Sequence, residues 1–271
     1  MTAKDRPGRS RLDLLLVARG LAPNRARAQA LVLAGQVTTG GRRLDKPGVL
    51  VSDDLPLLVA EGRRFVGRGA EKLGPALAAL GVRVEGREAL DVGASTGGFT
   101  QVLLEAGASR VVALDVGHGQ LDWSLRNDPR VVVLEGINAR LLVPSDLPCA
   151  PSLATIDVSF ISLRQVLLPA CACLSSGADV VALVKPQFEV GRGRVGKGGI
   201  VRDPALWDEV LSGLVDFAVE RGLGPAGIVR SALPGAEGNV EFFLHLKPGA
   251  PPAPANHLQT ARRKAVDAGT S

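Results

Sequence analysis

The chain has 271 residues, of which 46% are hydrophobic and 22% are charged, and its net charge is +5. This length and composition predict a globular protein with one large domain or two unequal domains. No apolar run reaches the length of a membrane span, and residues 1–11 lack the apolar core of a secretory signal, so we expect a cytoplasmic protein with no membrane partner.

The first sixty residues predict two short helices and then a glycine-rich β-ribbon. Residues 9–19 predict an amphipathic helix that starts near Ser10, and residues 25–34 predict a second helix, closed by Gly35. The ribbon consists of a strand over 37–39, turns at Gly40–Gly41 and 46–48, and a strand over 49–51. Together these elements predict a small α+β domain over residues 1–60.

Positive charge is concentrated in this first part of the chain. Residues 1–72 hold fourteen Lys and Arg against seven Asp and Glu, whereas the other 199 residues hold eighteen and twenty. This favours binding of a nucleic acid over the alternative, a solvated basic face. The element pattern resembles the αL-motif RNA-binding domain of a small-subunit ribosomal protein and of many pseudouridine synthases. The arginines expected to meet RNA phosphates are Arg11, Arg19, Arg25, Arg27, Arg42 and Arg43.

Residues 61–66 predict a linker, and residues 67–80 predict a helix at the start of a second domain, 67–248. From residue 87 strands and helices alternate, which predicts a mostly parallel seven-stranded sheet with helices on both faces. The expected strands are 89–92, 111–115, 131–134, 153–157, 180–184, 228–231 and 240–246, with a helix over 207–220 before the last two. The last two strands predict a hairpin-like return with one reversed strand, as in Rossmann-like methyltransferases. Residues 249–271 predict an Ala/Pro linker and a basic helix over 258–268.

The sequence Asp91-Val-Gly-Ala-Ser-Thr-Gly-Gly-Phe-Thr100 predicts a strand, a tight turn and a helix start. Glycines at such a turn let a ligand approach the backbone, and Asp115 ends the next strand, where an acid can bind both hydroxyls of a ribose. A dinucleotide or S-adenosylmethionine (SAM) would satisfy this pattern, and a turn without a ligand is the alternative. The spacing differs from G-x-G-x-x-G, which favours SAM.

Four ionisable residues stand at predicted strand ends or inside apolar runs. Asp157 and Lys185 each end a strand, Glu241 interrupts one, and Lys72 lies in the helix before the first strand. A lysine after five apolar residues is costly to bury without acidic partners. These residues predict either a catalytic group or a structural network of ion pairs.

Seven stretches, in order over nearly the whole chain, resemble the TlyA family of ribosomal RNA 2′-O-methyltransferases, in which an αL-type domain is fused to an FtsJ-like (RrmJ-like) domain. They are residues 65–73, 91–100, 115–121, 138–140, 157–163, 184–189 and 238–242. The resemblance implies an α/β class I SAM-dependent methyltransferase fold. It also implies that Lys72, Asp157, Lys185 and Glu241 are a Lys-Asp-Lys-Glu catalytic tetrad. Gly67 and Phe65 depart from the family's usual Ser and Trp or Tyr.

The resemblance also implies how substrates bind. We hypothesise that Lys185 faces the ribose 2′-oxygen, as a base or as a cation that steers its lone pair. The glycine turn holds the methionine end of SAM, Asp115 its ribose and Asn138 its adenine edge. The full set expected at the cofactor is Asp91, Gly93, Ala94, Ser95, Thr96, Gly97, Asp115, Val116, Asn138 and Asp157.

RNA is expected to meet a further set of residues beyond the first domain: Phe65, Arg68, Arg140 and Phe160. Phe160 is predicted to stack on a nucleotide displaced from the RNA, with a core aromatic as the alternative. The glycine-rich, basic residues 188–199 predict a lid over the RNA rather than a phosphate-binding loop.

We therefore expect a SAM-dependent rRNA (cytidine-2′-O)-methyltransferase that acts on ribosomal subunits. The N-terminal extension and the 258–268 helix resemble longer family members, which favours both subunits as substrates. Alternatives are a haemolysin-like membrane-active protein, a non-catalytic RNA-binding assembly factor and a small-molecule methyltransferase. We expect a monomer. Because Cys149, Cys171 and Cys173 lack the spacing of metal ligands, we expect no metal.

Overall fold

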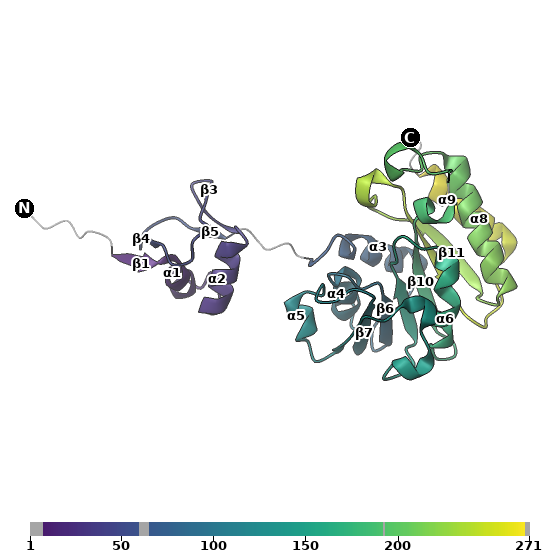
Figure 1. Cartoon of the computed structure of the whole chain (residues 1–271), viewed down its shortest axis with the longest axis horizontal. Coiled ribbons are helices and arrows are strands. Elements are labelled where there is room, and N and C mark those ends of the chain that lie inside the picture. The colour runs from purple at the N-terminus through teal and green to yellow at the C-terminus, as the bar shows by residue number, and fades with distance from the viewer. Residues whose placement is uncertain (1–7, 60–64, 192, 269–271) are drawn as a thin grey trace, which may run out of the picture. The chain divides into compact units, whose positions relative to one another are not determined.

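The chain forms two compact units, Met1–Arg64 and Phe65–Ser271. The structure is a computed structural model that describes residues 8–59, 65–191 and 193–268 (Figure 1). The predicted linker lies largely outside these ranges. Each unit is taken by itself below.

The N-terminal unit packs two helices against short strands. Helices α1 (Leu12–Ala18) and α2 (Arg25–Leu33) bury one face each around a small core that includes Leu12, Leu16 and Val32. The side chain of Asn24 caps α2 by accepting a hydrogen bond from the N–H of Arg27. The strands are β1 (Arg9–Arg11), β2 (Val37–Thr39), β3 (Arg42–Arg43), β4 (Leu50–Ser52) and β5 (Leu58–Val59).

The predicted start of the first helix is wrong by two residues. Residues 9–11 form β1, which pairs antiparallel with β4, and the helix begins only at Leu12. The strand over 49–51 therefore does not complete the ribbon. That sheet has the order β3-β2-β5 instead. Pairing partners so distant in sequence override the local helical pattern of Ser10 and Arg11.

Asp13 is completely buried at the start of α1. Its carboxylate accepts hydrogen bonds from the guanidinium groups of Arg11 and Arg25, and from the amide of Gln29 at 2.9 Å. These bonds tie α2 to the beginning of α1. The hydrogen bonds from Arg11 are the main reason that the pKa of Asp13 lies well below its usual range, although burial acts in the opposite direction.

We expect the N-terminal unit to lose stability in acid. Because the folded-state pKa of Asp13 is depressed, its stabilising contribution is complete above the unfolded value of about 4 and is lost as the pH falls below it. Circular dichroism during acid titration of the full chain should show this transition. Asp13→Asn should be less stable at neutral pH and should lose that acid-sensitive step; an unchanged acid transition would contradict the assignment.

A seven-stranded sheet forms the centre of the second unit, in the order β11-β12-β10-β9-β6-β7-β8. Neighbouring strands are parallel except β12, which runs antiparallel to both β10 and β11. The strands are β6 (Glu88–Val92), β7 (Arg110–Asp115), β8 (Val131–Glu135), β9 (Leu153–Ile156), β10 (Asp179–Val184), β11 (Pro225–Arg230) and β12 (Phe242–Leu246). The predicted fold class and the reversed strand are confirmed.

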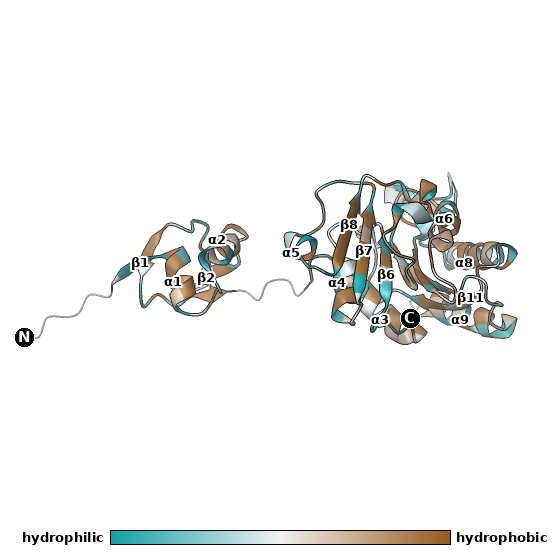
Figure 2. Ribbon diagram, turned by 90° about the horizontal axis from the view of Figure 1, so that it is seen from below, coloured by the Kyte–Doolittle hydropathy of each residue, from teal (hydrophilic) through white to brown (hydrophobic). Residues whose placement is uncertain are grey.

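Helices cover both faces of this sheet (Figure 1). One face packs against α3, α4 and α5, and the other against α6, α8 and α9. Strands β7 and β8 are hydrophobic along almost their whole length in Figure 2, as expected for parallel strands covered on both faces. The helices are α3 (Ala70–Leu80), α4 (Gly98–Glu105), α5 (Trp123–Arg126), α6 (Leu167–Ala172), α7 (Pro186–Glu189), α8 (Pro204–Glu220) and α9 (Ala255–Asp267).

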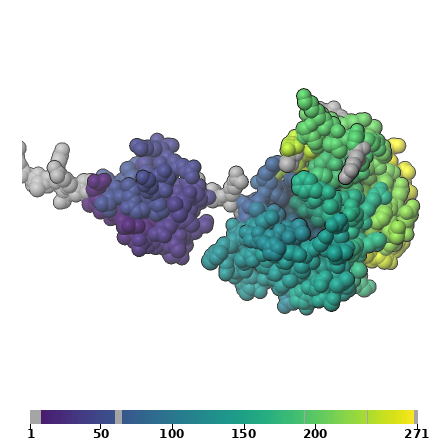
Figure 3. All heavy atoms as spheres, in the orientation of Figure 1, coloured from purple at the N-terminus to yellow at the C-terminus, as the bar shows by residue number. Residues whose placement is uncertain are grey.

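Short 3₁₀ turns complete the described connections. They are η1 (Ala139–Leu141), η2 (Pro144–Asp146), η3 (Leu163–Gln165), η4 (Lys197–Gly199) and η5 (Ala236–Gly238). Figure 3 shows one face of the larger unit, formed mostly by teal and green segments from the middle of the chain.

Several strand ends differ from the predicted ones. Strand β9 ends at Ile156, so Asp157 begins the following loop, and β12 begins only at Phe242. Glu241 lies just before β12, but its carbonyl still accepts a hydrogen bond from the N–H of Ser231 at 2.9 Å. Strand β11 lies three residues earlier than predicted at its start. The polar residues thus flank the strands instead of standing within them.

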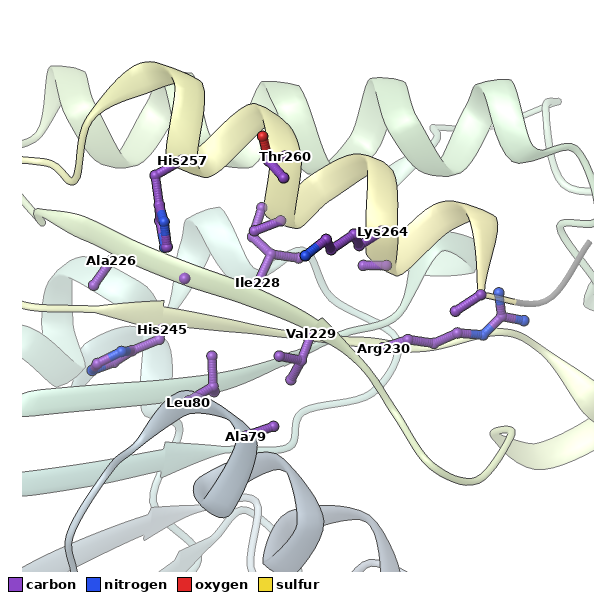
Figure 4. A pocket seen from close by; sticks show the side chains of 14 residues that line it. Ala79, Leu80, Ala226, Ile228, Val229, Arg230, His245, His257, Thr260 and Lys264 are labelled. Carbon is purple, nitrogen blue, oxygen red and sulfur yellow. The ribbon is translucent and has the colours of Figure 1, made fainter.

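Helix α9 confirms the predicted last helix and lies alongside β11, at the end of the sheet. Between α9, β11 and the end of α3 is a hollow of about 630 Å³. Figure 4 shows His257, Thr260 and Lys264 on its helical side and Leu80 from α3 opposite. Its lining residues are separate from those around the polar residues discussed next.

Candidate active site

The carboxyl ends of β6 and β9 meet at the centre of the sheet. The chain passes from β6 to β7 on one side and returns to β9 on the other, so this is the point where strand order reverses and where such sheets bind ligands. Gly93 follows β6 with φ +84°. A Cβ there would lie 2.4 Å from the carbonyl oxygen of Asp157, so only glycine allows the two loops to pack this closely.

The four ionisable residues singled out in the sequence form two ion pairs beside this point. The Nζ of Lys72, from α3, lies 2.6 Å from Oε2 of Glu241. The Nζ of Lys185, which follows β10, lies 2.6 Å from Oδ1 of Asp157 and donates a hydrogen bond to Oγ of Ser159 at 2.8 Å. The side chains of Lys72, Lys185 and Glu241 line one hollow.

The Lys72–Glu241 pair is deeply buried. Lys72 is 8% exposed and Glu241 is 2% exposed. Burial raises the pKa of Glu241, and the hydrogen bond and charge of Lys72 oppose that shift. The charges of Lys185 and Asp157 also act on Glu241, which places the two pairs in one electrostatic cluster.

We call the space beside the pairs the tetrad hollow. It has a volume of about 470 Å³. Phe160 stands in its wall with 87% of its surface exposed, and its ring centroid is 5.3 Å from that of Phe188. The remaining walls come from Arg68, Ser159, Gln187, Val195, Gly199, Glu237 and Asn239.

A second space, the glycine-turn hollow, adjoins it. Its volume is about 440 Å³, and Ser159 and Phe160 line both hollows. Val92, Leu114 and Ile137 give it apolar walls, and Asp115 and Asn138 supply polar groups. A smaller hollow of about 110 Å³ lies between Gly69, the glycine turn, α4 and Asp157. An apolar slot with few polar groups, next to a backbone-lined recess, suits a nucleoside carrying an amino-acid chain.

Most residues predicted at the cofactor line these spaces. The glycine-turn hollow is lined by Gly93, Ser95, Asp115, Val116, Asn138 and Asp157, and the smaller hollow also by Ala94 and Thr96. The carboxylate of Asp115 accepts hydrogen bonds from the N–H of Ser95 at 2.8 Å and of Gly117 at 2.7 Å. The side chain of Asn138 accepts one from the N–H of Arg140.

Asp91 and Gly97 lie behind these hollows and do not line them. Asp91 is completely buried and accepts hydrogen bonds from the hydroxyls of Thr100 and Thr155. Burial raises its pKa to about 7, against those hydrogen bonds. A Cβ on Gly97, at φ +97°, would collide with Leu125 and Leu121. Both residues thus stabilise the glycine turn through buried contacts and do not themselves line the hollows.

Comparison with known proteins establishes the family to which the chain belongs. Residues 65–248 match the model of the FtsJ-like methyltransferases, and residues 10–54 match that of the S4 domain. The chain is 50% identical over 264 residues to the 16S/23S rRNA (cytidine-2′-O)-methyltransferase TlyA of Mycobacterium tuberculosis, covering 96% of this chain and 98% of that protein. The chain belongs to the FtsJ-like methyltransferases, in the TlyA family.

Two further similar proteins carry a hemolysin name. Hemolysin A of Brachyspira hyodysenteriae is 39% identical over 236 residues, with 87% of this chain and 98% of that protein covered. A solved structure from Streptococcus thermophilus, also named as a hemolysin, has 42% identity and a TM-score of 0.73, with 97% and 96% of the two chains covered. None of the helices within the described ranges is both long and apolar enough to span a membrane.

Several arginines of the S4 domain make hydrogen bonds within the domain. Arg11 and Arg25 bind Asp13, and Arg19 donates hydrogen bonds to the carbonyls of Asp53 and Leu55. Arg27, Arg42 and Arg43 are exposed. Arg19 and Arg25 are exposed as well, and contact of any of these arginines with RNA stays a prediction.

The other predicted RNA-binding residues belong to the FtsJ-like domain. Arg68 is exposed, lines the tetrad hollow and donates a hydrogen bond to the carbonyl of Pro234 at 3.1 Å. Arg140 lines the glycine-turn hollow. Phe65 is half-buried against the core formed with α3 and α4, so its role at RNA is the least supported of these.

Several polar residues at the FtsJ-like site have no predicted role. Ser159 binds Lys185, and Gln120 lines the glycine-turn hollow and contacts Ser95 at 3.3 Å. Asn239 bridges from the tetrad to the glycine-rich loop through the N–H of Val201 and the carbonyl of Gly199. All three lie within the motif stretches, and this was the only feature of the sequence that could have indicated a role for them. Their hydrogen-bond partners depend on tertiary contacts, which the sequence does not reveal. Among described residues, no three His, Cys, Asp or Glu are grouped so that they could hold a metal ion.

Asp115→Ala is expected to weaken SAM binding at least about tenfold, because it removes a carboxylate from the wall of the glycine-turn hollow and frees the Ser95 and Gly117 N–H groups. Titration calorimetry measures this affinity directly. Asp122→Ala is the matched control, since Asp122 caps α5 through Ser124 without lining the hollow. Equal SAM affinity in wild type and Asp115→Ala would overturn the ribose-binding role.

Proposed function

We propose that the chain uses SAM to methylate the 2′-hydroxyl of cytidine in ribosomal RNA, within ribosomal subunits of both sizes. The observation that carries this proposal is the convergence of Lys72, Asp157, Lys185 and Glu241 beside the glycine turn. The name of the M. tuberculosis relative, at 50% identity, supports the choice of nucleotide and of both subunits. The S4 domain supports an RNA substrate.

SAM fits the residues of the glycine-turn hollow and the recess beside it. Gly93, Ala94, Ser95 and Thr96 would hold its methionine end, Asp115 its ribose and Asn138 its adenine edge. When bound, SAM supplies an electrophilic methyl group. Ser159 and Phe160 line both hollows, so an acceptor in the tetrad hollow would lie next to this methyl group.

Lys185 is the group proposed to face the ribose oxygen. The Nζ of Lys185 donates a hydrogen bond to Oγ of Ser159, and Oδ1 of Asp157, its ion-pair partner, lies 2.6 Å away. The remaining side is available for the 2′-hydroxyl in the tetrad hollow, and Lys185 in its neutral form would accept the hydroxyl proton as the new O–CH₃ bond forms. The Lys72–Glu241 pair stabilises the back of the site, so that Lys185 is held in one orientation when the hydroxyl arrives.

Phe160 is proposed to stack on the base of the acceptor nucleotide. Its exposure excludes the alternative of a core aromatic, and an exposed ring over a hollow is suited to an unstacked base. The side chain of Phe188 supports it from α7.

Methyl transfer from tritiated SAM to purified small and large ribosomal subunits tests the function. The subunits should come from cells without this enzyme, and the labelled RNA should be digested to nucleosides. We expect label in 2′-O-methylcytidine from both subunits, and none with the Lys185→Ala variant. Label on a base, label in another nucleoside or no label would contradict the proposal.

A further inference from the structure

The loop between β9 and η3 holds Phe160 in an unusual backbone conformation. Its φ is +67°, in the left-handed region that a bulky side chain adopts only under constraint. In the same loop Ser159 contacts Lys185, and both Ser159 and Phe160 line the two hollows. Some other part of the protein must therefore hold this loop in place.

The carboxylate of Glu189 makes that connection. Glu189 ends α7, and its Oε2 accepts a hydrogen bond from the hydroxyl of Ser162 at 2.7 Å. Its Oε1 accepts another from the N–H of Leu163, also at 2.7 Å. Desolvation by burial raises the pKa of Glu189, and the Ser162 hydrogen bond opposes this shift. Both oxygens are thus used to bind the far end of the loop.

Helix α7 also carries the partners of that loop. Lys185 immediately precedes the helix and binds Ser159, and Phe188 on the helix packs against Phe160. Glu189 itself lines neither the tetrad hollow nor the glycine-turn hollow. Any effect of its side chain on the reaction must therefore pass through the loop or through α7.

We propose that Glu189 is a positioning residue for the acceptor nucleotide. By binding Ser162 and Leu163, it holds the loop so that the Phe160 ring faces the tetrad hollow and Ser159 orients Lys185. This inference rests on the proposed function, because it assigns a purpose to the geometry of the same site.

Two substitutions separate the hydrogen bonds from the charge. Glu189→Ala removes both acceptors and is expected to lower kcat/KM for the ribosomal subunit by about 10- to 100-fold, the range seen when reacting groups are slightly misplaced. Glu189→Gln keeps an acceptor for Leu163 and a group that can donate to Ser162, so it should stay within about threefold of wild type. Ser162→Ala removes one of the two bonds and should give a smaller loss than Glu189→Ala.

Thermal unfolding and SAM calorimetry of each variant exclude a general loss of structure. SAM affinity is expected to fall less than kcat/KM, because the loop forms only one wall of the glycine-turn hollow and the wall with Asp115 is untouched. Glu220→Ala, at the exposed end of α8, is the matched control for loss of a glutamate. If Glu189→Ala retains wild-type kcat/KM, or if Glu189→Gln loses as much as Glu189→Ala, the proposal is wrong.

A double-mutant cycle tests whether Glu189 acts through Phe160. If it does, Glu189→Ala should cost much less in a Phe160→Ala background than in the wild type, because the ring that it positions is already absent. A purely structural role would give the same loss in the Phe160→Ala background and in a Ser159→Ala background as in the wild type, and that result would contradict the inference. An inactive wild-type enzyme would instead contradict the proposed function, so the two failures are distinguishable.

Discussion

The Lys185→Ala enzyme is expected to methylate RNA at least about a thousandfold more slowly than wild type, since the group that faces the acceptor oxygen is removed. Lys185 reaches the tetrad hollow from the end of β10, where Asp157 and Ser159 hold its Nζ. Alanine would remove the group that faces the hydroxyl, and the other lysine of the hollow, Lys72, is paired with Glu241. Single-turnover methyl transfer with saturating SAM measures this step directly.

The matched control for this substitution is Lys264→Ala, an exposed lysine of α9 that lines only the separate hollow beside β11. It removes the same charge without touching either ion pair, and it should keep wild-type activity. SAM affinity of Lys185→Ala should also be preserved, because Lys185 does not line the glycine-turn hollow. Near wild-type methylation by Lys185→Ala would remove the basis of the proposed mechanism.

Breaking the Lys72–Glu241 pair is expected to lower the free energy of unfolding by about 3–5 kcal/mol, because one charge is left buried without its partner. Glu241→Leu leaves the Lys72 ammonium in that position, and Lys72→Met leaves the Glu241 carboxylate. Chemical denaturation of the full chain measures the change, with the transition of the FtsJ-like domain analysed separately from that of the S4 domain.

The double variant Lys72→Met/Glu241→Leu separates stability from chemistry. Replacing both charges with apolar side chains removes the cost of an unpaired buried charge, so most of the stability should return. Methyl transfer should nevertheless stay low, because the electrostatic environment behind Lys185 is gone. Recovery of both stability and activity would show that the pair is structural only.

Two of the four residues proposed for catalysis leave a local signal in the sequence. Lys185 follows the apolar run Val180–Val184, and Asp157 follows the apolar β9. Parallel strands bring such end positions to one edge, so residues distant in sequence were expected to meet. Lys72 and Glu241 are 169 positions apart, and it was the family resemblance that paired them with the other two.

The supporting contacts could not be predicted, because they depend on packing between elements. Glu189 is one of many acids with no local peculiarity, and only the fold brings it to Ser162. In the S4 domain, counting charges indicated RNA binding but could not show that Asp13 already binds Arg11 and Arg25. For the same reason the local pattern of residues 9–11 predicted helix where pairing with β4 makes a strand.

The loop that bears Ser159 and Phe160 forms a common wall of the two hollows. A molecule bound on one side that settles this loop changes the binding free energy available on the other side, and such linkage is reciprocal. If an engaged ribosomal subunit raises the affinity for SAM by some factor, SAM must raise the affinity for the subunit by the same factor. The two binding equilibria would then be linked through this shared wall.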